Sequence, residues 1–157
     1  MPSVHRQTFV ALVNEHGWTR GAELGVDKGI LFGMLLHQCP TLEYLIGVDT
    51  FPDRARSSRV FQFAVDHWQR VKLYDMSTDH ASRKVEEGSL DFVFIDADHS
   101  YEAVRSDIDK WFHAVRAGGW LGGHDYSKKF PGVITAVDEA FGKRVQRWPG
   151  DIWGVWV

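Results

Sequence analysis

The segment at residues 21–29, with the sequence GAELGVDKG, constrains the fold of this chain more than any other feature. A short apolar strand runs directly into glycines at Gly25 and Gly29, and an apolar helical segment at residues 30–38 follows. Glycine tolerates positive φ and has no Cβ, so a turn of this composition lets a ligand lie against bare backbone. The N-terminus of the next helix adds unpaired N–H donors. The segment therefore predicts a strand-turn-helix unit that binds a nucleotide-like ligand.

An acidic residue, Glu23, stands before the first glycine of this turn. Phosphate-binding turns offer N–H groups to an anion, whereas a carboxylate suits a ligand with a positive or hydroxyl-bearing end. The spacing Gly25-x-x-x-Gly29 also differs from the Gly-x-Gly-x-x-Gly pattern that surrounds the pyrophosphate of NAD. Both features favour S-adenosylmethionine over ATP or NAD, and they make an NAD-linked dehydrogenase the weaker alternative.

Strands and helices alternate along the chain. We expect helices at residues 4–15, 30–38, 56–69, 78–85, 100–115 and 133–141, and strands at residues 22–26, 44–49, 71–74, 90–97, 120–123, 144–148 and 152–157. Parallel strands need crossover connections, so the alternation predicts helices on both faces of a parallel sheet. The tight turn at residues 149–151 makes the last strand antiparallel. The expected fold class is α/β: a Rossmann-like, doubly wound, mostly parallel seven-stranded sheet with an antiparallel last strand.

Length and composition predict one domain, residues 1–157, in which residues 1–19 form an N-terminal helix that packs on the core or the cleft. A hydrophobic content of 44% is enough for a core. Six tryptophans are expected to pack structurally: Trp68, Trp111, Trp120, Trp148, Trp153 and Trp156. The formal net charge of −3, without a long basic run, argues against nucleic acid as a partner.

The single cysteine, Cys39, cannot form an internal disulfide and is expected to be a small packing residue. No apolar run approaches the roughly 20 residues that a membrane helix needs, so no membrane partner is expected. The N-terminus also lacks the layout of a signal peptide. We therefore expect a cytoplasmic protein.

Aspartates stand at the carboxyl ends of the predicted strands, where open α/β sheets bind their ligands. Asp49 can accept hydrogen bonds from both ribose hydroxyls of a nucleoside, although a loop aspartate that caps the next element is the structural alternative. Met76 and Ser77 can wall an adenine, and Ser77 equally fits a helix N-cap. The predicted cofactor-binding residues are Glu23, Gly25, Asp49, Thr50, Met76, Ser77 and Asp96.

A denser cluster follows two adjacent strands: Asp96, Asp98 and His99 after the fourth, and His124 and Asp125 after the fifth. Carboxylates suit Mg²⁺ or Ca²⁺, while histidine also allows Mn²⁺, Fe²⁺ or Zn²⁺. A metal ion here can hold a substrate hydroxyl and lower its pKa, and His99 can remove the proton so that the oxygen attacks a methyl group. The structural alternative is that Asp98 or His99 only caps the following helix.

The order of these motifs resembles class I S-adenosylmethionine-dependent methyltransferases, over roughly residues 20 to 157. The resemblance rests on the segments ELGVDKG at 23–29, GVD at 47–49, DFVFID at 91–96 and GG at 118–119. The segments FIDADHSY at 94–101 and GGHDY at 122–126 are similar to a small bacterial methyltransferase subgroup and, in layout, to metal-dependent O-methyltransferases. The resemblance implies that Glu23 and Gly25 contact the methionine part of the cofactor. Asp49 would then bind the ribose, and Met76 with Ser77 the adenine.

The same resemblance implies a metal site and a base. Asp96, His124 and Asp125 are the implied ligands of Mg²⁺ or Mn²⁺, and His99 is the implied general base, with Asp96 also counted as catalytic. The sequence departs from the catechol enzymes by placing His99 where they have a lysine base and His124 where they have an aspartate ligand.

Taken together, the residues predict an S-adenosylmethionine-dependent methyltransferase that carries out metal-assisted O-methylation of a small hydroxylated substrate. One alternative is a metal-dependent hydrolase that uses Asp96, His99, His124 and Asp125 to activate water. The turn at residues 21–29 argues against it, because a hydrolase needs no nucleoside pocket. A second alternative is a non-catalytic domain that binds the cofactor or a partner. The acceptor stays open, as does assembly into a homo-oligomer.

Overall fold

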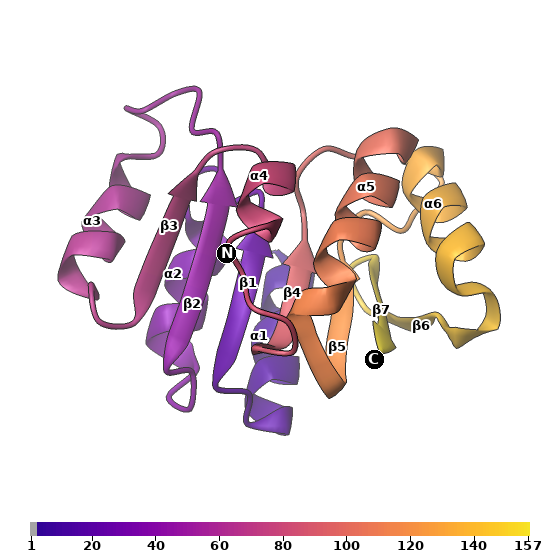
Figure 1. Ribbon diagram of the computed structural model, residues 1–157, viewed down its shortest axis with the longest axis horizontal. Helices are drawn as coiled ribbons and strands as arrows, with labels where there is room; N and C mark the ends of the chain where they lie inside the picture. Colours follow the sequence, from indigo (N-terminus) through magenta and orange to yellow (C-terminus); the bar gives the residue numbers. More distant parts are fainter. Residues whose placement is uncertain (1–2) are drawn as a thin grey trace.

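The structure, a computed structural model, describes residues 3–157. These residues form a seven-stranded sheet in the order β3-β2-β1-β4-β5-β7-β6 (Figure 1). The strands are β1 Arg20–Leu24, β2 Tyr44–Asp49, β3 Val71–Asp75, β4 Leu90–Ile95, β5 Val115–Gly123, β6 Gln146–Trp148 and β7 Ile152–Trp156. β1 to β5 pair in parallel, and β7 runs antiparallel to both β5 and β6. The predicted fold class is confirmed.

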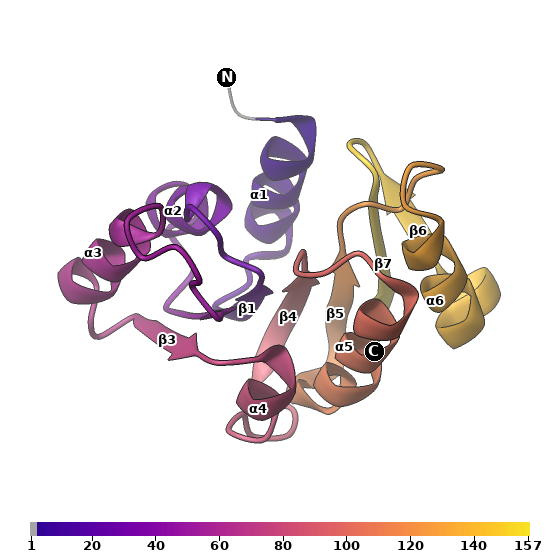
Figure 2. The ribbon, with the colours of Figure 1, turned by 90° about the horizontal axis from the view of Figure 1, so that it is seen from above.

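Helices cover both faces of the sheet, with α1, α2 and α3 on one side and α4, α5 and α6 on the other (Figure 2). Their bounds are α1 Val4–His16, α2 Ile30–Gln38, α3 Ser58–Asp66, α4 Thr78–Ser82, α5 Tyr101–Trp111 and α6 Pro131–Phe141, and short 3₁₀ turns follow α5 and α6. Side chains alternate across a strand, so Phe92 and Phe94 of β4 join the α1–α3 layer while Val93 and Ile95 join the other. None of the helices within residues 3–157 has the length and apolarity to cross a membrane.

An aromatic cluster holds α1 against the sheet. The ring of Phe9 lies 4.2 Å from that of Phe94 and 5.4 Å from that of Trp120, measured between centroids. All three side chains are fully buried, and large aromatic rings contribute most of the packing energy in such contacts. The cluster fixes the first turn of α1 near the carboxyl ends of β4 and β5.

Several element bounds differ from those expected. β1 begins at Arg20 because a carboxylate oxygen of Asp91 accepts the backbone N–H groups of Thr19 and Arg20, at 2.7 and 2.9 Å. β5 begins at Val115 instead of residue 120, and its pairing to β4 is irregular between Val115 and Trp120, the stretch that contains Gly118 and Gly119. The helices α3, α4 and α5 are shorter than the expected ranges 56–69, 78–85 and 100–115. In each case the residues after the helix form the connection to the next strand.

The expectation that Trp68 packs structurally is wrong. α3 ends at Asp66, so Trp68 falls in the turn before β3 and is 72% exposed. By contrast, Trp111, Trp120 and Trp153 are fully buried.

Candidate active site

The turn after β1 brings the ends of β1, β2 and β4 together. Gly25 has a φ of +90°, and its N–H donates to the carbonyl of Val48 at 2.8 Å. A Cβ at this position would lie 2.2 Å from the backbone oxygen of Asp96. Only glycine fits such a conformation and such an approach, so the turn provides the bare backbone that its sequence predicts.

A cavity of about 780 Å³, called the main cavity below, lies beyond these strand ends. This volume is within the range of sites that bind small molecules and cofactors. Its lining residues are Gly25, Asp27, Val48, Asp49, Thr50, Met76, Ser77, Thr78, Asp96, Ala97, Asp98 and His99. The cavity thus collects every predicted cofactor-binding residue except Glu23, together with the predicted base His99.

Backbone hydrogen bonds orient the carboxylate of Asp49 at the wall of the main cavity. Its Oδ2 accepts the N–H of Asp27 and its Oδ1 accepts the N–H of Phe51, each at 2.9 Å. A carboxylate has about four acceptor positions, so both oxygens retain capacity for a ligand. The local structural role and a role in binding ribose are therefore compatible.

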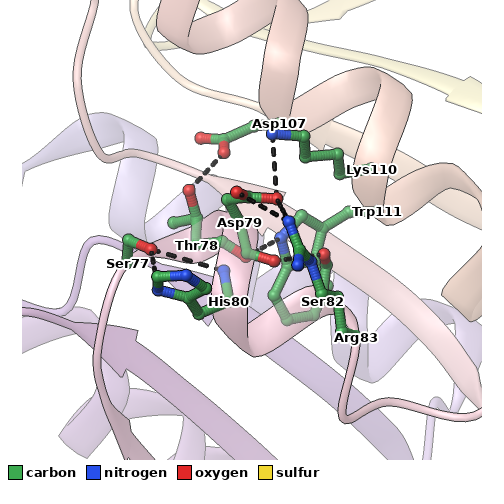
Figure 3. A network of polar contacts seen from close by, with 9 residues as sticks. All are labelled: Ser77, Thr78, Asp79, His80, Ser82, Arg83, Asp107, Lys110 and Trp111. Atoms are coloured by element: carbon green, nitrogen blue, oxygen red, sulfur yellow. Dashed lines mark hydrogen bonds and ion pairs between the residues drawn. The ribbon is translucent and has the colours of Figure 1, made fainter.

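The wall of the main cavity continues from Asp49 to residues 76–78, because the N–H of Met76 donates to the carbonyl of Asp49 at 3.1 Å, and polar contacts tie the start of α4 to α5 (Figure 3). Ser77 caps α4, because its Oγ accepts the N–H of His80 at 3.3 Å. The Oγ1 of Thr78 donates to Oδ1 of Asp107 at 2.5 Å, and Nε1 of Trp111 donates to the carbonyl of Thr78 at 3.1 Å. These bonds fix the position of residues 76–78 beside the cavity.

Glu23 lines a second, smaller cavity of about 280 Å³, called the side cavity below. The side cavity shares Gly25, Asp27, Asp96, Ala97 and His99 with the main cavity. Glu23 is only 2% exposed, and its Oε2 has no hydrogen-bond partner among residues 3–157. Burial, and next the charge of Asp96, raise the pKa of Glu23 well above its ordinary value. Such a carboxyl group calls for a donor or a cation from a ligand.

The predicted cluster after β4 and β5 does come together. Nδ1 of His99 lies 2.9 Å from Oδ2 of Asp125, and Nδ1 of His124 lies 3.1 Å from Oδ1 of the same residue. His124 also approaches Oδ1 of Asp96 at 3.4 Å. One ligand atom from each of Asp96, His99 and Asp125 lies within 4.8 Å of the others, which is close enough to hold a metal ion. Asp125 adopts a φ of +66°, a conformation uncommon outside glycine.

A further histidine, which the sequence analysis did not include, joins this cluster. His5, from the first turn of α1, stacks on His124 with 3.8 Å between ring centroids, and His5, Asp96 and His124 form a second group of possible metal ligands. Burial, with the nearby His124, lowers the pKa of His5 to about 4. Burial also opposes the charge on His124, but its contact with Asp96 raises its pKa overall. Only the packing of α1 brings His5 here, and no sequence spacing signals it.

Asp98 has a structural role in this region. Its Oδ1 accepts the N–H of Ser100 at 2.7 Å, and the hydroxyl of Ser100 in turn caps α5 by accepting the N–H of Ala103 at 3.4 Å. Asp98 belongs to neither group of possible metal ligands within residues 3–157. The structural alternative thus holds for Asp98, whereas His99 points to Asp125 instead of capping the helix.

A comparison of the sequence with models of known protein families identifies the family of this chain. The family model described as "Methyltransferase domain" matches residues 22–126, which is more than half of the chain. The chain belongs to this methyltransferase family. The resemblance to class I S-adenosylmethionine-dependent methyltransferases is thereby confirmed, as is the prediction of a methyltransferase. No curated protein matches the chain.

Solved structures similar to this methyltransferase domain share its fold. An O-methyltransferase from Bacillus cereus in complex with SAH superposes with a TM-score of 0.74 at 16% identity, over 100% of this chain and 83% of that one. CalS11, a TDP-rhamnose 3′-O-methyltransferase of calicheamicin biosynthesis, gives 0.75 at 15% identity, over 98% and 80%. Cofactor-bound Rv0187 from MTB gives 0.73 at 18% identity, over 98% and 79%. At these identities the likeness establishes the fold alone.

Proposed function

We propose that this methyltransferase domain binds S-adenosylmethionine in the main cavity and methylates a hydroxyl group of a small molecule, assisted by a divalent metal ion. One observation carries the proposal: the lining of the main cavity contains Gly25 and Asp49, which suit a nucleoside, and also His99. Nδ1 of His99 is held by Asp125. A binding site for a cofactor and a base for its reaction thus share one space.

Three features of the chain fit the cofactor. The backbone at Gly25 leaves no room for a Cβ, Asp49 retains acceptor capacity for ribose hydroxyls, and the buried Oε2 of Glu23 has no hydrogen-bond partner among residues 3–157. The Bacillus cereus neighbour is described in complex with SAH, which supports the same class of ligand here. When bound, S-adenosylmethionine supplies a methyl group on a positively charged sulfur.

His99 is suited to remove the proton of the acceptor hydroxyl. A neutral histidine that donates from Nδ1 to Asp125 presents Nε2 as an acceptor. His99 would take the hydroxyl proton of the acceptor at Nε2 while the bound cofactor supplies the methyl group to the acceptor oxygen. The residues of the chain act by orientation and by deprotonation, both of which accelerate such transfers.

A metal ion would be held by Asp96, His124 and Asp125, because His124 lies 3.4 Å from Asp96 and 3.1 Å from Asp125; His5 would join it, since it forms a group of possible ligands with Asp96 and His124. Two carboxylates and two imidazoles suit Mn²⁺ better than Mg²⁺, which prefers oxygen ligands. His5 is neutral at physiological pH because its pKa is about 4, and metal ligands must be deprotonated. A bound ion would lower the pKa of the acceptor hydroxyl. The family model that matches the chain describes a methyltransferase domain, and no comparable finding supports the metal-dependent hydrolase.

Calorimetric titration of S-adenosylmethionine tests the cofactor half of the proposal. We expect micromolar-range binding to the wild-type protein and at least about tenfold weaker binding to Asp49→Asn, because hydrogen bonds to a charged group contribute about 1.5–3 kcal/mol. Asp75→Asn is the matched control: Asp75 also ends a strand, but it pairs with Arg54 and does not line the main cavity. Absence of binding to the wild-type protein, with and without Mn²⁺, would refute the proposal.

Separate measurements distinguish the base from the metal ligands. Binding of Mn²⁺ is followed by electron paramagnetic resonance, and turnover on a panel of hydroxylated compounds by release of S-adenosylhomocysteine. We expect His5→Ala to weaken Mn²⁺ binding and His99→Gln to retain Mn²⁺ and cofactor binding while losing turnover. If His99→Gln abolishes Mn²⁺ binding instead, His99 is a ligand, and the assignment of the base is wrong.

A further inference from the structure

A groove of about 700 Å³ runs along the outer side of α2, the helix that lies between α1 and α3 (Figure 2). It is called the α2 groove below. Its lining includes Ile30, Met34 and His37 of α2, Arg59 and Phe63 of α3, and Arg6 of α1. No residue that lines the α2 groove also lines the main cavity. The proposed methyl transfer therefore leaves this groove without a role.

The floor of the α2 groove is apolar, because a glycine lets an aromatic ring of α3 pack against α2. A Cβ at Gly33 would lie 2.7 Å from Cζ of Phe63, so this ring occupies the space of a side chain. The ring of His37 lies edge-on to that of Phe63, with 5.8 Å between centroids. Ile30 stays 40% exposed. The distance along α2 from Ile30 to His37 is about 10 Å, which gives the length of the apolar floor.

Two arginines line the groove near the first turn of α2. Arg6 lines both the α2 groove and the side cavity, as Ile30 does. Arg59 precedes Val60, whose Cγ2 would lie 2.6 Å from a Cβ at Gly29. Neither arginine forms an ion pair within 4.0 Å to a carboxylate among residues 3–157. Within this part of the chain, the groove lining contains no aspartate or glutamate. The groove thus combines an apolar floor with positive charge at one end.

We propose that the α2 groove binds a small amphipathic carboxylate, with its apolar body along α2 and its carboxylate at Arg59 and Arg6. The volume of the groove falls in the range of small-molecule sites. A guanidinium is the preferred partner for a carboxylate, because its planar N–H groups match both oxygens. Asp96 lines the adjoining side cavity, and its charge opposes a doubly charged phosphate more than a carboxylate. This inference does not depend on the proposed function.

Titration of decanoate into ¹⁵N-labelled protein, followed by ¹H–¹⁵N NMR, tests the location of the site. We expect saturable shifts of the backbone amide signals of Ile30, Gly33 and His37, and none at Thr50 or Ser77 of the main cavity. Octanoate should bind about four- to tenfold more weakly, because it lacks two methylene groups that the groove covers in part. Decanol, which has the same body without a charge, should bind at least about fivefold more weakly than decanoate.

Two variants test the parts of the site separately. Arg59→Gln should weaken decanoate about fivefold and leave decanol unchanged, because only the anion uses the guanidinium. Its control is Arg105→Gln, since Arg105 lies on α5 in the opposite layer. Ile30→Glu adds a negative charge at an exposed position of the floor and should abolish decanoate binding. Its control is Val65→Glu, because Val65 is exposed on α3 and does not line the groove. Neither control should change the affinity for decanoate.

Three results would overturn the inference. The first is the absence of saturable shifts along α2 in the wild-type protein. The second is binding of decanoate that Arg59→Gln and Ile30→Glu leave unchanged, which would place the ligand elsewhere. The third is tighter binding of decyl phosphate than of decanoate, which would make phosphate the preferred head group. Each of these results leaves the proposed function intact, because no S-adenosylmethionine is present in the titrations.

Discussion

Replacing Asp107 by asparagine tests whether one buried carboxyl group makes this protein less stable as the pH rises. Asp107 lies on α5 at 3% exposure, where it accepts the hydrogen bond from Thr78 that fixes the wall of the main cavity (Figure 3). Burial raises the pKa of Asp107 from 3.8 to about 6, although the bond from Thr78 and the charge of Lys110 oppose the rise. The folded protein therefore holds this proton more tightly than the unfolded chain.

The magnitude follows from the difference in pKa. About two pKa units correspond to about 3 kcal/mol. Because the folded pKa of Asp107 is raised, its contribution to the free energy of unfolding is fully present below about pH 4 and is lost as the pH rises through about 6. Asparagine has no proton to lose, and its carbonyl oxygen can still accept the bond from Thr78. We expect Asp107→Asn to equal the wild type near pH 4 and to be more stable by up to about 3 kcal/mol at pH 7.

Urea unfolding followed by circular dichroism, repeated at intervals between pH 4 and pH 7, measures this difference. Asp109→Asn is the control, because Asp109 is exposed on the same helix and pairs with Arg105. Its difference from the wild type should stay within about 0.5 kcal/mol at every pH, as for other exposed pairs. A difference between Asp107→Asn and the wild type that stays constant across this range, or that shrinks as the pH rises, would refute the reasoning.

Two other substitutions test the turn after β1 and the exposed tryptophan. Gly25→Ala should lower the free energy of unfolding by about 3 kcal/mol or more and abolish binding of S-adenosylmethionine, because positive φ and a 2.2 Å approach to Asp96 both oppose a Cβ. Gly118→Ala, where the nearest atom lies at 3.6 Å, should cost only about 1 kcal/mol in the same urea titrations. Trp68→Ser should change the free energy of unfolding by less than about 0.5 kcal/mol in thermal or urea unfolding, and a larger loss would mean that the indole packs after all.

The order of the strands and helices could be predicted because the evidence for it is local. Apolar runs separated by helical segments leave few arrangements other than a parallel sheet with crossovers. The final hairpin follows from its turn, where Gly150 and Asp151 both adopt positive φ. Bounds that depend on distant residues could not be predicted, such as the start of β1, which a carboxylate of Asp91 in β4 determines.

The residues of the candidate site also fall into two groups: those that local sequence predicts and those that only distant packing brings to the site. Asp49, Asp96 and Asp125 could be placed together from the sequence, because the carboxyl ends of parallel strands meet at one edge of the sheet. His5 and Arg6 could not, since their place depends on how α1 packs rather than on any spacing in the chain. The amphipathic pattern of α1 predicts a buried face, but not the point on the sheet where that face docks.

The N-terminal helix supplies what the sheet alone lacks. The ends of β1 and β4 carry Glu23 and Asp96, two acids close enough for each to oppose the charge on the other. The packing of Phe9 against Phe94 holds the first turn of α1 over them, and that turn adds a guanidinium at Arg6 and an imidazole at His5. Gly25 and Asp49, which line the main cavity, are positioned by the sheet and its loops alone. Arg6 and His5 reach these acids only through α1, so the balance of charge at this edge of the sheet depends on the docking of this one helix.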